Sequence, residues 1–288
     1  MSTVFIVGCG DIGTRVARRY RERGEAVTAL VRSPEKAPPL EQLGITTVIA
    51  DLDDPATLTG VPFAGTTLFY FAPPPGGGHT DPRVRNFCAS LPPDAQPSKI
   101  IYMSTSGVYG DCGDEVVTEE SPALPRTARG KRRLDAELQL LEWGVERGVP
   151  VIVLRVTGIY GPGRLPVSQL TGGQPVLDAG IANLTNRIHS EDLVTVCLAA
   201  AERGEAGELF NVSDGHPGTM TDYFNGVADL LGLPRPRQLS WEEARQEMSP
   251  LMLSYVSESR RMENRKMLEK LGVTLRYPTL AEGLTACK

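Results

Sequence analysis

Short apolar runs rich in valine and isoleucine alternate with amphipathic segments along the first two thirds of the chain. Apolar runs of this length predict strands buried on both faces, and the longer segments between them predict helices. We therefore expect βαβ units that build a parallel sheet. The expected strands are residues 3–7, 26–31, 47–50, 67–71, 99–103, 151–155 and 208–212.

The segment 12–23 shows the helical pattern most clearly. Ile12, Val16 and Tyr20 recur at the spacing of one helix face, five arginines occupy the other positions, and Gly24 follows as a stop signal. We expect this helix to begin directly after the first strand.

Two stretches interrupt the alternation. Residues 73–82 contain three consecutive prolines and then three glycines, which predicts a loop at the carboxyl end of a strand. Residues 161–186 are rich in Gly, Pro, Thr and Asn, and the tail after residue 219 is mainly helical. The prediction is a doubly wound α/β domain of the Rossmann type, residues 1–160 completed by 187–213, with a smaller, mostly helical substrate-binding lobe from residues 161–186 and 214–288.

Composition narrows the classes of partner. The 288 residues are enough for a sizeable core, and the net charge of -5 provides no basic surface for nucleic acid or anionic lipid. The five cysteines are scattered without metal-ligand spacing, so we expect reduced thiols and no metal. No signal-peptide pattern and no apolar run of about 18 residues is present, so we expect a cytoplasmic protein without a membrane partner.

The strongest local motif is the Gly-x-Gly-x-x-Gly sequence that follows the first strand. In this arrangement Gly8 allows the tight turn, Gly10 allows a pyrophosphate to approach the backbone, and Gly13 allows close packing of the helix on the strand. A turn with spare glycines would look the same, but the strand, the spacing and the following helix all agree. We expect a dinucleotide to contact this turn at Gly8, Gly10, Asp11, Ile12 and Gly13.

The residues after the second strand indicate which dinucleotide is bound. Arg32 and Ser33 stand where an NAD-binding protein usually has an acid, and a guanidinium beside a hydroxyl suits a 2′-phosphate. The sequence therefore favours NADP over NAD, although a solvated surface arginine would give the same pattern.

Two further strand ends add expected cofactor contacts. Asp51 and Leu52 follow the third strand at the place expected for the adenine, although an aspartate there can also cap the next turn. Ala72 and Pro73 follow the fourth strand and are expected beside the nicotinamide ribose.

Hydroxyl residues gather at the end of the fifth strand, in the segment Ser104-Thr105-Ser106. Ligands of open parallel sheets bind at this edge, so a hydroxyl there is placed to bind a substrate carbonyl or alcohol. A polar strand-to-loop turn is the simpler alternative.

The chain resembles the extended short-chain dehydrogenase/reductase family, which includes nucleotide-sugar epimerases and dehydratases. The likeness covers nearly the whole sequence and rests on several motifs in order. These are residues 8–13, 104–110, 154–164, 187–193 and 210–215.

The resemblance implies that Thr105 is the catalytic serine or threonine that binds the reacting oxygen. The family's Tyr-x-x-x-Lys pair aligns with Arg129 and Arg133, while a shifted register pairs Thr127 with Lys131. The tyrosine is absent in both registers, and an arginine, with a pKa above about 12, cannot shuttle protons near neutral pH. The chain is therefore expected to be an atypical member with an altered proton relay.

Three replacements for the relay are conceivable. Tyr109 or Tyr160 supplies a phenol, Thr105 acts with a water molecule, or a cationic wall binds an anionic substrate or an oxyanion. A solvated basic face at the start of a helix is the alternative to that wall. The wall would consist of Arg129, Lys131, Arg132 and Arg133.

Two functions follow from these observations. The first is an NAD(P)(H)-dependent oxidoreductase or epimerase-type enzyme that acts on a carbonyl/alcohol pair of a small metabolite. The second is a non-catalytic NADP(H)-binding sensor or regulatory protein. A homodimer is common in the family and is a possible assembly.

Overall fold

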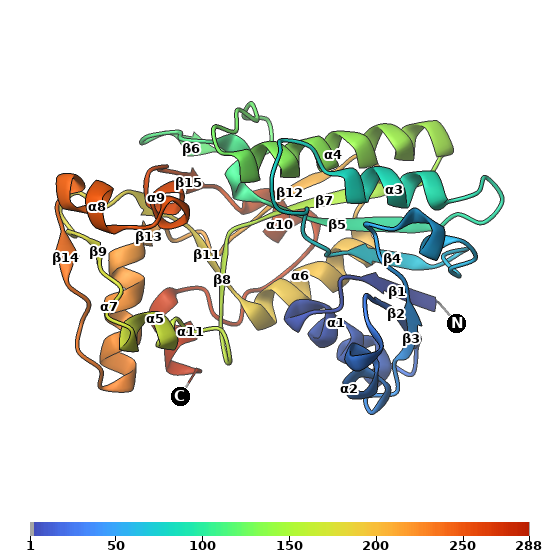
Figure 1. Cartoon of the computed structure of the whole chain (residues 1–288), viewed down its shortest axis with the longest axis horizontal. Helices are drawn as coiled ribbons and strands as arrows, with labels where there is room; N and C mark the ends of the chain where they lie inside the picture. The colour runs from blue at the N-terminus through green and yellow to red at the C-terminus, as the bar shows by residue number, and fades with distance from the viewer. Residues whose placement is uncertain (1–2, 288) are drawn as a thin grey trace.

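A seven-stranded parallel sheet forms the centre of the molecule. The structure of the chain is a computed structural model that describes residues 3–287 (Figure 1). The strand order is β12-β7-β5-β4-β1-β2-β3, and every neighbouring pair is parallel. The doubly wound α/β fold is confirmed, and the seven expected strands agree with the structure within two residues at each end. The strands are β1 (Thr3–Val7), β2 (Ala26–Val31), β3 (Thr46–Ile49), β4 (Thr67–Tyr70), β5 (Lys99–Thr105), β7 (Val151–Val156) and β12 (Leu209–Val212).

Helices cover both faces of this sheet (Figure 1). On one face α1 (Asp11–Glu22) packs beside α6 (Ser190–Arg203), and on the other α3 (Pro82–Ser90) packs beside α4 (Ala128–Arg147). Strand β1 contributes side chains to the apolar clusters on both faces of the sheet. Val4 and Ile6 belong to the cluster on one face, and Phe5 and Val7 belong to the cluster on the other. The strand is therefore apolar at every position after Thr3, as its sequence is.

The strand order reverses beside β1, since the chain proceeds outward through β2 and β3 and then returns to β4 on the other side. Such a switch point leaves a crevice at the carboxyl ends of the strands, where ligands of this fold bind. The glycine turn after β1 and the end of β5 both lie at this edge.

The smaller lobe is built from short helices and paired short strands. Its helices are α5 (Val167–Thr171), α7 (Met220–Leu231), α8 (Trp241–Glu247), α9 (Pro250–Val256) and α11 (Leu280–Thr285). Strand β9 (Val176–Leu177) pairs with β14 (Gln238–Leu239), and β10 (Leu184–Thr185) pairs with β13 (Gly218–Thr219). Two small apolar clusters of its own hold it together, one around Tyr160 and Tyr223 and one around Leu177 and Leu239.

One late segment packs differently from the expected division. The boundaries at residues 160, 187 and 214 stay a prediction, but α10 (Arg265–Lys270) contacts β12, and Met267, Leu271 and Val273 belong to the core of the sheet domain. Strand β15 (Arg261–Met262) also pairs with β6 (Val116–Val117). The apolar positions of a helix predict that one face is buried, but they do not indicate which core buries it. From the sequence, this segment is therefore expected in the lobe together with the rest of the tail.

Two remaining strands, β8 (Gly158–Tyr160) and β11 (Arg187–His189), form a parallel pair between sheet and lobe. Within residues 3–287, no helix combines the length and the apolar character needed to cross a membrane.

Candidate functional site

The glycine turn has the geometry that its sequence predicts. Gly8 has a φ of +91°, and a Cβ built there would lie 2.4 Å from the backbone nitrogen of Ala72. A Cβ at Gly13 would lie 3.0 Å from the Gly8 carbonyl oxygen, so the helix packs directly on the turn. At Gly10, which caps α1, a Cβ would meet no atom of residues 3–287 within 4 Å apart from its chain neighbours. The space beside the free N–H groups of α1 is therefore open, which fits a dinucleotide pyrophosphate.

The two residues inside the motif face different ways. The side chain of Ile12 is 6% exposed and belongs to the core, so only its backbone is available to a cofactor. Asp11 is exposed, and its carboxylate accepts hydrogen bonds from Arg15 Nε at 2.9 Å and Arg164 Nη1 at 3.1 Å. Because Arg164 comes from the loop after β8, this contact joins the glycine turn to the entrance of the lobe.

The end of β2 carries the expected basic residue. Arg32 is exposed and Ser33 is partly exposed, and both lie next to the turn after β3. In the turn after β3, Asp53 accepts two hydrogen bonds from Arg83, at 2.6 and 2.8 Å. These hydrogen bonds lower the pKa of the Asp53 carboxyl.

The other two expected cofactor contacts differ in exposure. Asp51 accepts the N–H of Asp53 at 3.0 Å, which is the turn-capping role that the sequence left open. Leu52 and Ala72 are buried, each 6% exposed, whereas Pro73 is exposed at the edge of a cavity.

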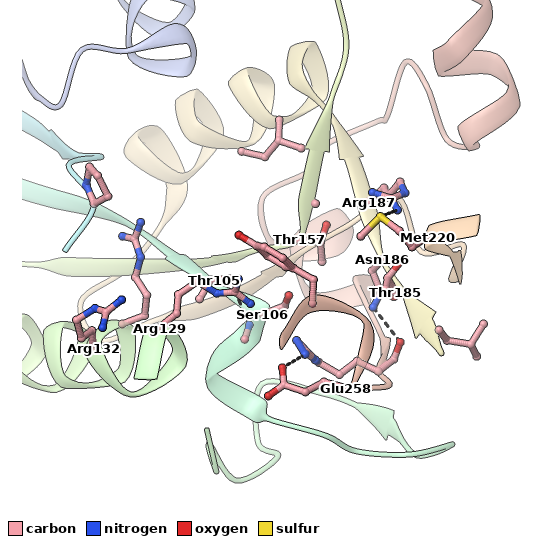
Figure 2. Close-up of a pocket in the computed structure, with 18 of the residues that line it drawn as sticks. Thr105, Ser106, Arg129, Arg132, Thr157, Thr185, Asn186, Arg187, Met220 and Glu258 are labelled. Carbon is pink, nitrogen blue, oxygen red and sulfur yellow. Dashed lines mark hydrogen bonds and ion pairs between the residues drawn. The ribbon is translucent and has the colours of Figure 1, made fainter. Parts of the chain in front are cut away.

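This cavity lies between the sheet and the lobe, beyond the carboxyl ends of β5 and β7 (Figure 2), and has a volume of about 490 Å³. Side chains from α4 and from the end of β5 line one side, and those of β11 and the lobe line the other. Its charged lining residues are Arg129, Arg132, Arg133, Arg164, Arg187, Arg260 and Glu258.

Three predicted catalytic positions meet in this cavity: Thr105, Arg129 and Arg133 all line it. The close approach depends on Gly130, where a Cβ would lie 2.5 Å from the carbonyl oxygen of Gly107. The start of α4 therefore packs directly on the turn that follows β5. Thr105 Oγ1 also accepts the N–H of Gly107 at 3.3 Å, which holds its hydroxyl at the cavity edge.

The two registers expected for the missing Tyr-x-x-x-Lys pair differ in which residues line the cavity. Thr127 caps α4 by accepting the N–H of Gly130 at 3.2 Å, and Lys131 is exposed outside the cavity lining. Arg129 and Arg133 therefore occupy the cavity positions. Of the four cations expected to form a wall, Arg129, Arg132 and Arg133 line the cavity and Lys131 does not.

The two arginines are held differently. Arg133 Nη1 donates to the carbonyl oxygen of Met103 at 2.8 Å and to the Tyr102 hydroxyl at 3.3 Å. Arg129 stacks its guanidinium 3.9 Å from the ring centroid of Tyr255, and its buried Nη1 has no hydrogen-bond partner among residues 3–287. The nitrogen of Arg129 that lies beside Thr105 is Nη2, which a Cβ built on Gly107 would approach to 4.0 Å.

Two tyrosines considered as replacement phenols lie elsewhere. Tyr109 is buried and donates to Asn211 Oδ1 at 2.8 Å, and Tyr160 is buried and donates to the carbonyl oxygen of Thr279 at 3.3 Å. Neither lines the cavity.

A buried ion pair supports the cavity from behind. Glu137 is 1% exposed and accepts hydrogen bonds from Arg155 Nη2 at 2.8 Å and from the hydroxyl of Ser104. Since Ser104 precedes Thr105 and Glu137 lies one turn after Arg133 on α4, this pair fixes β5, β7 and α4 relative to one another.

Sequence reasoning missed two lining residues from distant segments, Tyr255 of α9 and Arg187 of β11. Arg187 stacks 3.9 Å from the ring centroid of Tyr223, its Nη2 contacts Met220 Sδ at 3.5 Å, and burial lowers its pKa to about 10. The guanidinium therefore remains charged at neutral pH. Figure 2 shows Arg187 across the cavity from Arg129 and Thr105.

Residues 8–203 match the protein family described as NAD(P)H-binding. A 3-diazoavenalumate denitrifying reductase from Streptomyces is 27% identical over 98% of both chains. Two trifunctional dehydratase/epimerase/reductase proteins of Arabidopsis thaliana match 52% of this chain at 23% and 24% identity, and the match covers only 24% of their own length.

Solved structures agree with the fold. A protein of unknown function from Silicibacter pomeroyi is 30% identical, with a TM-score of 0.82 over 100% of this chain and 98% of that one. A dTDP-glucose 4,6-dehydratase from Bacillus anthracis, solved in complex with NAD, has a TM-score of 0.77 at 16% identity over 99% of this chain and 94% of that one. With its glycine turn, its strand order and this match over residues 8–203, the chain belongs to the NAD(P)H-binding family, among the extended short-chain dehydrogenases/reductases.

Proposed function

We propose that this protein is an NADP(H)-dependent oxidoreductase that interconverts a carbonyl and an alcohol, or an equivalent reducible group, in a small anionic metabolite. The observation that carries the proposal is the arginine-lined cavity at the carboxyl end of β5. Six arginines and one carboxylate line it, and that carboxylate, Glu258, is paired with Arg260. A cavity with this excess of positive charge favours an anion.

The cavity residues support separate tasks in this function. The Thr105 hydroxyl and the Arg129 guanidinium would bind the reacting oxygen, because both residues line the cavity where α4 meets β5. The nicotinamide supplies or accepts the hydride when the cofactor is bound. Donors fixed before the reaction stabilise negative charge that develops on this oxygen.

Arg187 would hold the anionic group of the substrate at the opposite side. Its guanidinium stacks on the ring of Tyr223. Within residues 3–287, no carboxylate accepts a hydrogen bond from Arg187. A partly buried cation without an acidic hydrogen-bond partner is costly in the free protein, so a carboxylate or phosphate of the substrate would relieve this cost.

The preference for NADP rests on Arg32 and Ser33, which are accessible at the end of β2. The NAD in the Bacillus anthracis dehydratase does not transfer to this chain, because that protein is only 16% identical. The name of the Streptomyces relative, a reductase of an acid anion, supports the reductive direction.

The direct test is oxidation of NADPH, followed by absorbance, with 4-carboxybenzaldehyde, succinic semialdehyde and benzaldehyde as probes. We expect turnover of the acidic aldehydes, and we expect Arg187→Met to raise their KM at least tenfold while leaving benzaldehyde unaffected. Equal turnover of benzaldehyde and 4-carboxybenzaldehyde in both proteins would contradict the role of Arg187.

The non-catalytic sensor remains the second candidate, because Arg129 occupies the position of the family's tyrosine. NADPH binding without turnover of any of the three probes would favour it over the enzyme.

A further inference from the structure

The cavity holds few groups that can exchange a proton. Its six arginines stay protonated at neutral pH, and its threonine and serine hydroxyls are weak acids. Two other lining residues of the described chain, Tyr255 and Glu258, can donate or accept a proton.

Glu258 is poorly placed for proton transfer with solvent. It is 3% exposed, and Oε2 of its carboxylate is bound by Arg260 in an ion pair. Its Oε1 is buried and finds no partner within residues 3–287. Its carboxylate is therefore closed off from bulk water by its burial and by the Arg260 guanidinium.

Tyr255 has the opposite surroundings. It is 42% exposed and also lines the cavity, so this side chain borders both the cavity and bulk water. Its ring lies 3.9 Å from the guanidinium carbon of Arg129. A cation in this position attracts a phenolate more strongly than a neutral phenol, because the ring then carries negative charge.

Arg129 also connects Tyr255 with Thr105. A Cβ built on Gly107 would lie 3.6 Å from Thr105 Oγ1 and 4.0 Å from Arg129 Nη2, so both groups border one small space. The Thr105 hydroxyl, the Arg129 guanidinium and the Tyr255 ring therefore follow one another along the cavity wall. A substrate oxygen bound by Thr105 and Arg129 would lie on the side of Arg129 that faces the cavity.

We propose that Tyr255, from α9 of the lobe, is the catalytic acid/base of this site, with Arg129 stabilising its phenolate. This inference rests on the proposed oxidoreductase function. The family's tyrosine and cation both come from the helix that aligns with α4. In this chain the cation occupies the tyrosine position of α4, and the phenol comes from the lobe.

In the reductive direction, the hydride and its two electrons would reach the substrate carbonyl carbon from bound NADPH, which would be oxidised in supplying them. The carbonyl π electrons move to the oxygen, and this oxygen accepts the proton of the Tyr255 hydroxyl. The phenolate formed is stabilised by Arg129 and is reprotonated by water, which the exposed ring allows.

The first experiment needs no substrate. Purified full-length protein is treated with phenylmethanesulfonyl fluoride at pH 8, and sulfonylation of each tyrosine is followed by peptide mass mapping. If Arg129 stabilises the phenolate, Arg129→Met should slow labelling of Tyr255 by roughly 2- to 30-fold, the range expected for a lost cation–π contact. Labelling of Tyr277, which lies outside the cavity lining, provides the internal reference.

Arg132→Met is the matched control. Arg132 lies on the same helix and lines the same cavity, but its Nη1 donates to the carbonyl oxygens of Gly77 and Gly78 at 3.2 and 2.9 Å. If this variant slows labelling of Tyr255 as much as Arg129→Met does, the specific stabilisation by Arg129 is wrong.

The second experiment uses the protein with NADPH and 4-carboxybenzaldehyde. We expect Tyr255→Phe to lower kcat about 100-fold or more and to abolish the pH dependence attributed to the acid, with NADPH affinity unchanged. Turnover by Tyr255→Phe within threefold of the unmodified chain overturns the proposal. If Glu258→Gln instead removes the pH dependence, Glu258 is the acid/base and Tyr255 is not. Absence of turnover of all three aldehyde probes by the unmodified chain contradicts the oxidoreductase function, while the labelling result still decides the Arg129–Tyr255 pairing.

Discussion

The ion pair between Glu137 and Arg155 should be the most sensitive polar contact in the core. Arg155 is 5% exposed and Glu137 is 1% exposed, with a separation of 2.8 Å between Nη2 and Oε2. Glu137→Gln removes the negative charge but keeps the volume of the side chain. A buried guanidinium without its counter-ion typically costs about 3–5 kcal/mol, so the free energy of unfolding should fall by about 3 kcal/mol. Typical domains have only about 5–15 kcal/mol in total.

The assay is equilibrium unfolding in urea followed by circular dichroism, with Glu202→Gln as the matched control. Glu202 pairs with Arg23 at the surface at 2.6 Å, and such exposed pairs contribute about 0.2–1 kcal/mol. The double variant Glu137→Met/Arg155→Met should recover most of the loss, because it leaves no buried charge. A loss below 1 kcal/mol in Glu137→Gln, or no recovery in the double variant, would refute this explanation.

Two further predictions concern the glycine turn and a buried acid. Gly8→Ala should abolish NADPH binding, because its Cβ would lie 2.4 Å from the backbone nitrogen of Ala72. The control is Gly24→Ala, which has a similar φ of +77° but lies in open space and should bind NADPH normally. Equal NADPH binding by the two variants would contradict the steric argument. Burial raises the pKa of Asp214 from 3.8 to about 6, so the folded state binds the carboxyl proton more tightly than the unfolded state does. The stability that this proton contributes is fully present below about pH 4 and is lost as the pH rises through 6. In urea unfolding, the stability of the unmodified protein relative to Asp214→Asn should therefore fall by about 2–3 kcal/mol between pH 4 and 7, and a constant difference would refute this.

The sheet and the glycine turn could be predicted because their signals are local. Each strand is a short apolar run, and Gly8, Gly10 and Gly13 have roles set by neighbours within the same turn. Thr105 could also be placed at the cavity, since it ends a strand at the edge where this fold binds ligands.

The rest of the site depends on contacts between distant segments. Arg129 meets Tyr255 only after the lobe has folded against α4, and α9 is a seven-residue helix with no motif of its own. Arg187 received no role from the sequence, although it begins the segment 187–193 that carries the family resemblance and lies two residues before His189. That histidine caps α6 by accepting the N–H of Glu191 at 3.2 Å.

Gly130 already argued against the shifted register on α4, because that register spoils the match at this glycine. Gly130 lies in the first turn of a long helix, where a glycine is unfavourable, and the structure shows that it permits contact with Gly107. A glycine at this position indicates a close approach, and this places Arg129 and Arg133, rather than Lys131, against the cavity.

The most direct test of the central claim is titration of the purified protein with NADPH and NADH, followed by nicotinamide fluorescence. We predict saturable binding that is tighter for NADPH, and we predict that Arg32→Asp weakens NADPH binding at least tenfold without weakening NADH binding. Equal affinity for the two nucleotides in both proteins would contradict the role of Arg32 while leaving the glycine turn as the cofactor site. No saturable binding of either nucleotide would contradict the account as a whole.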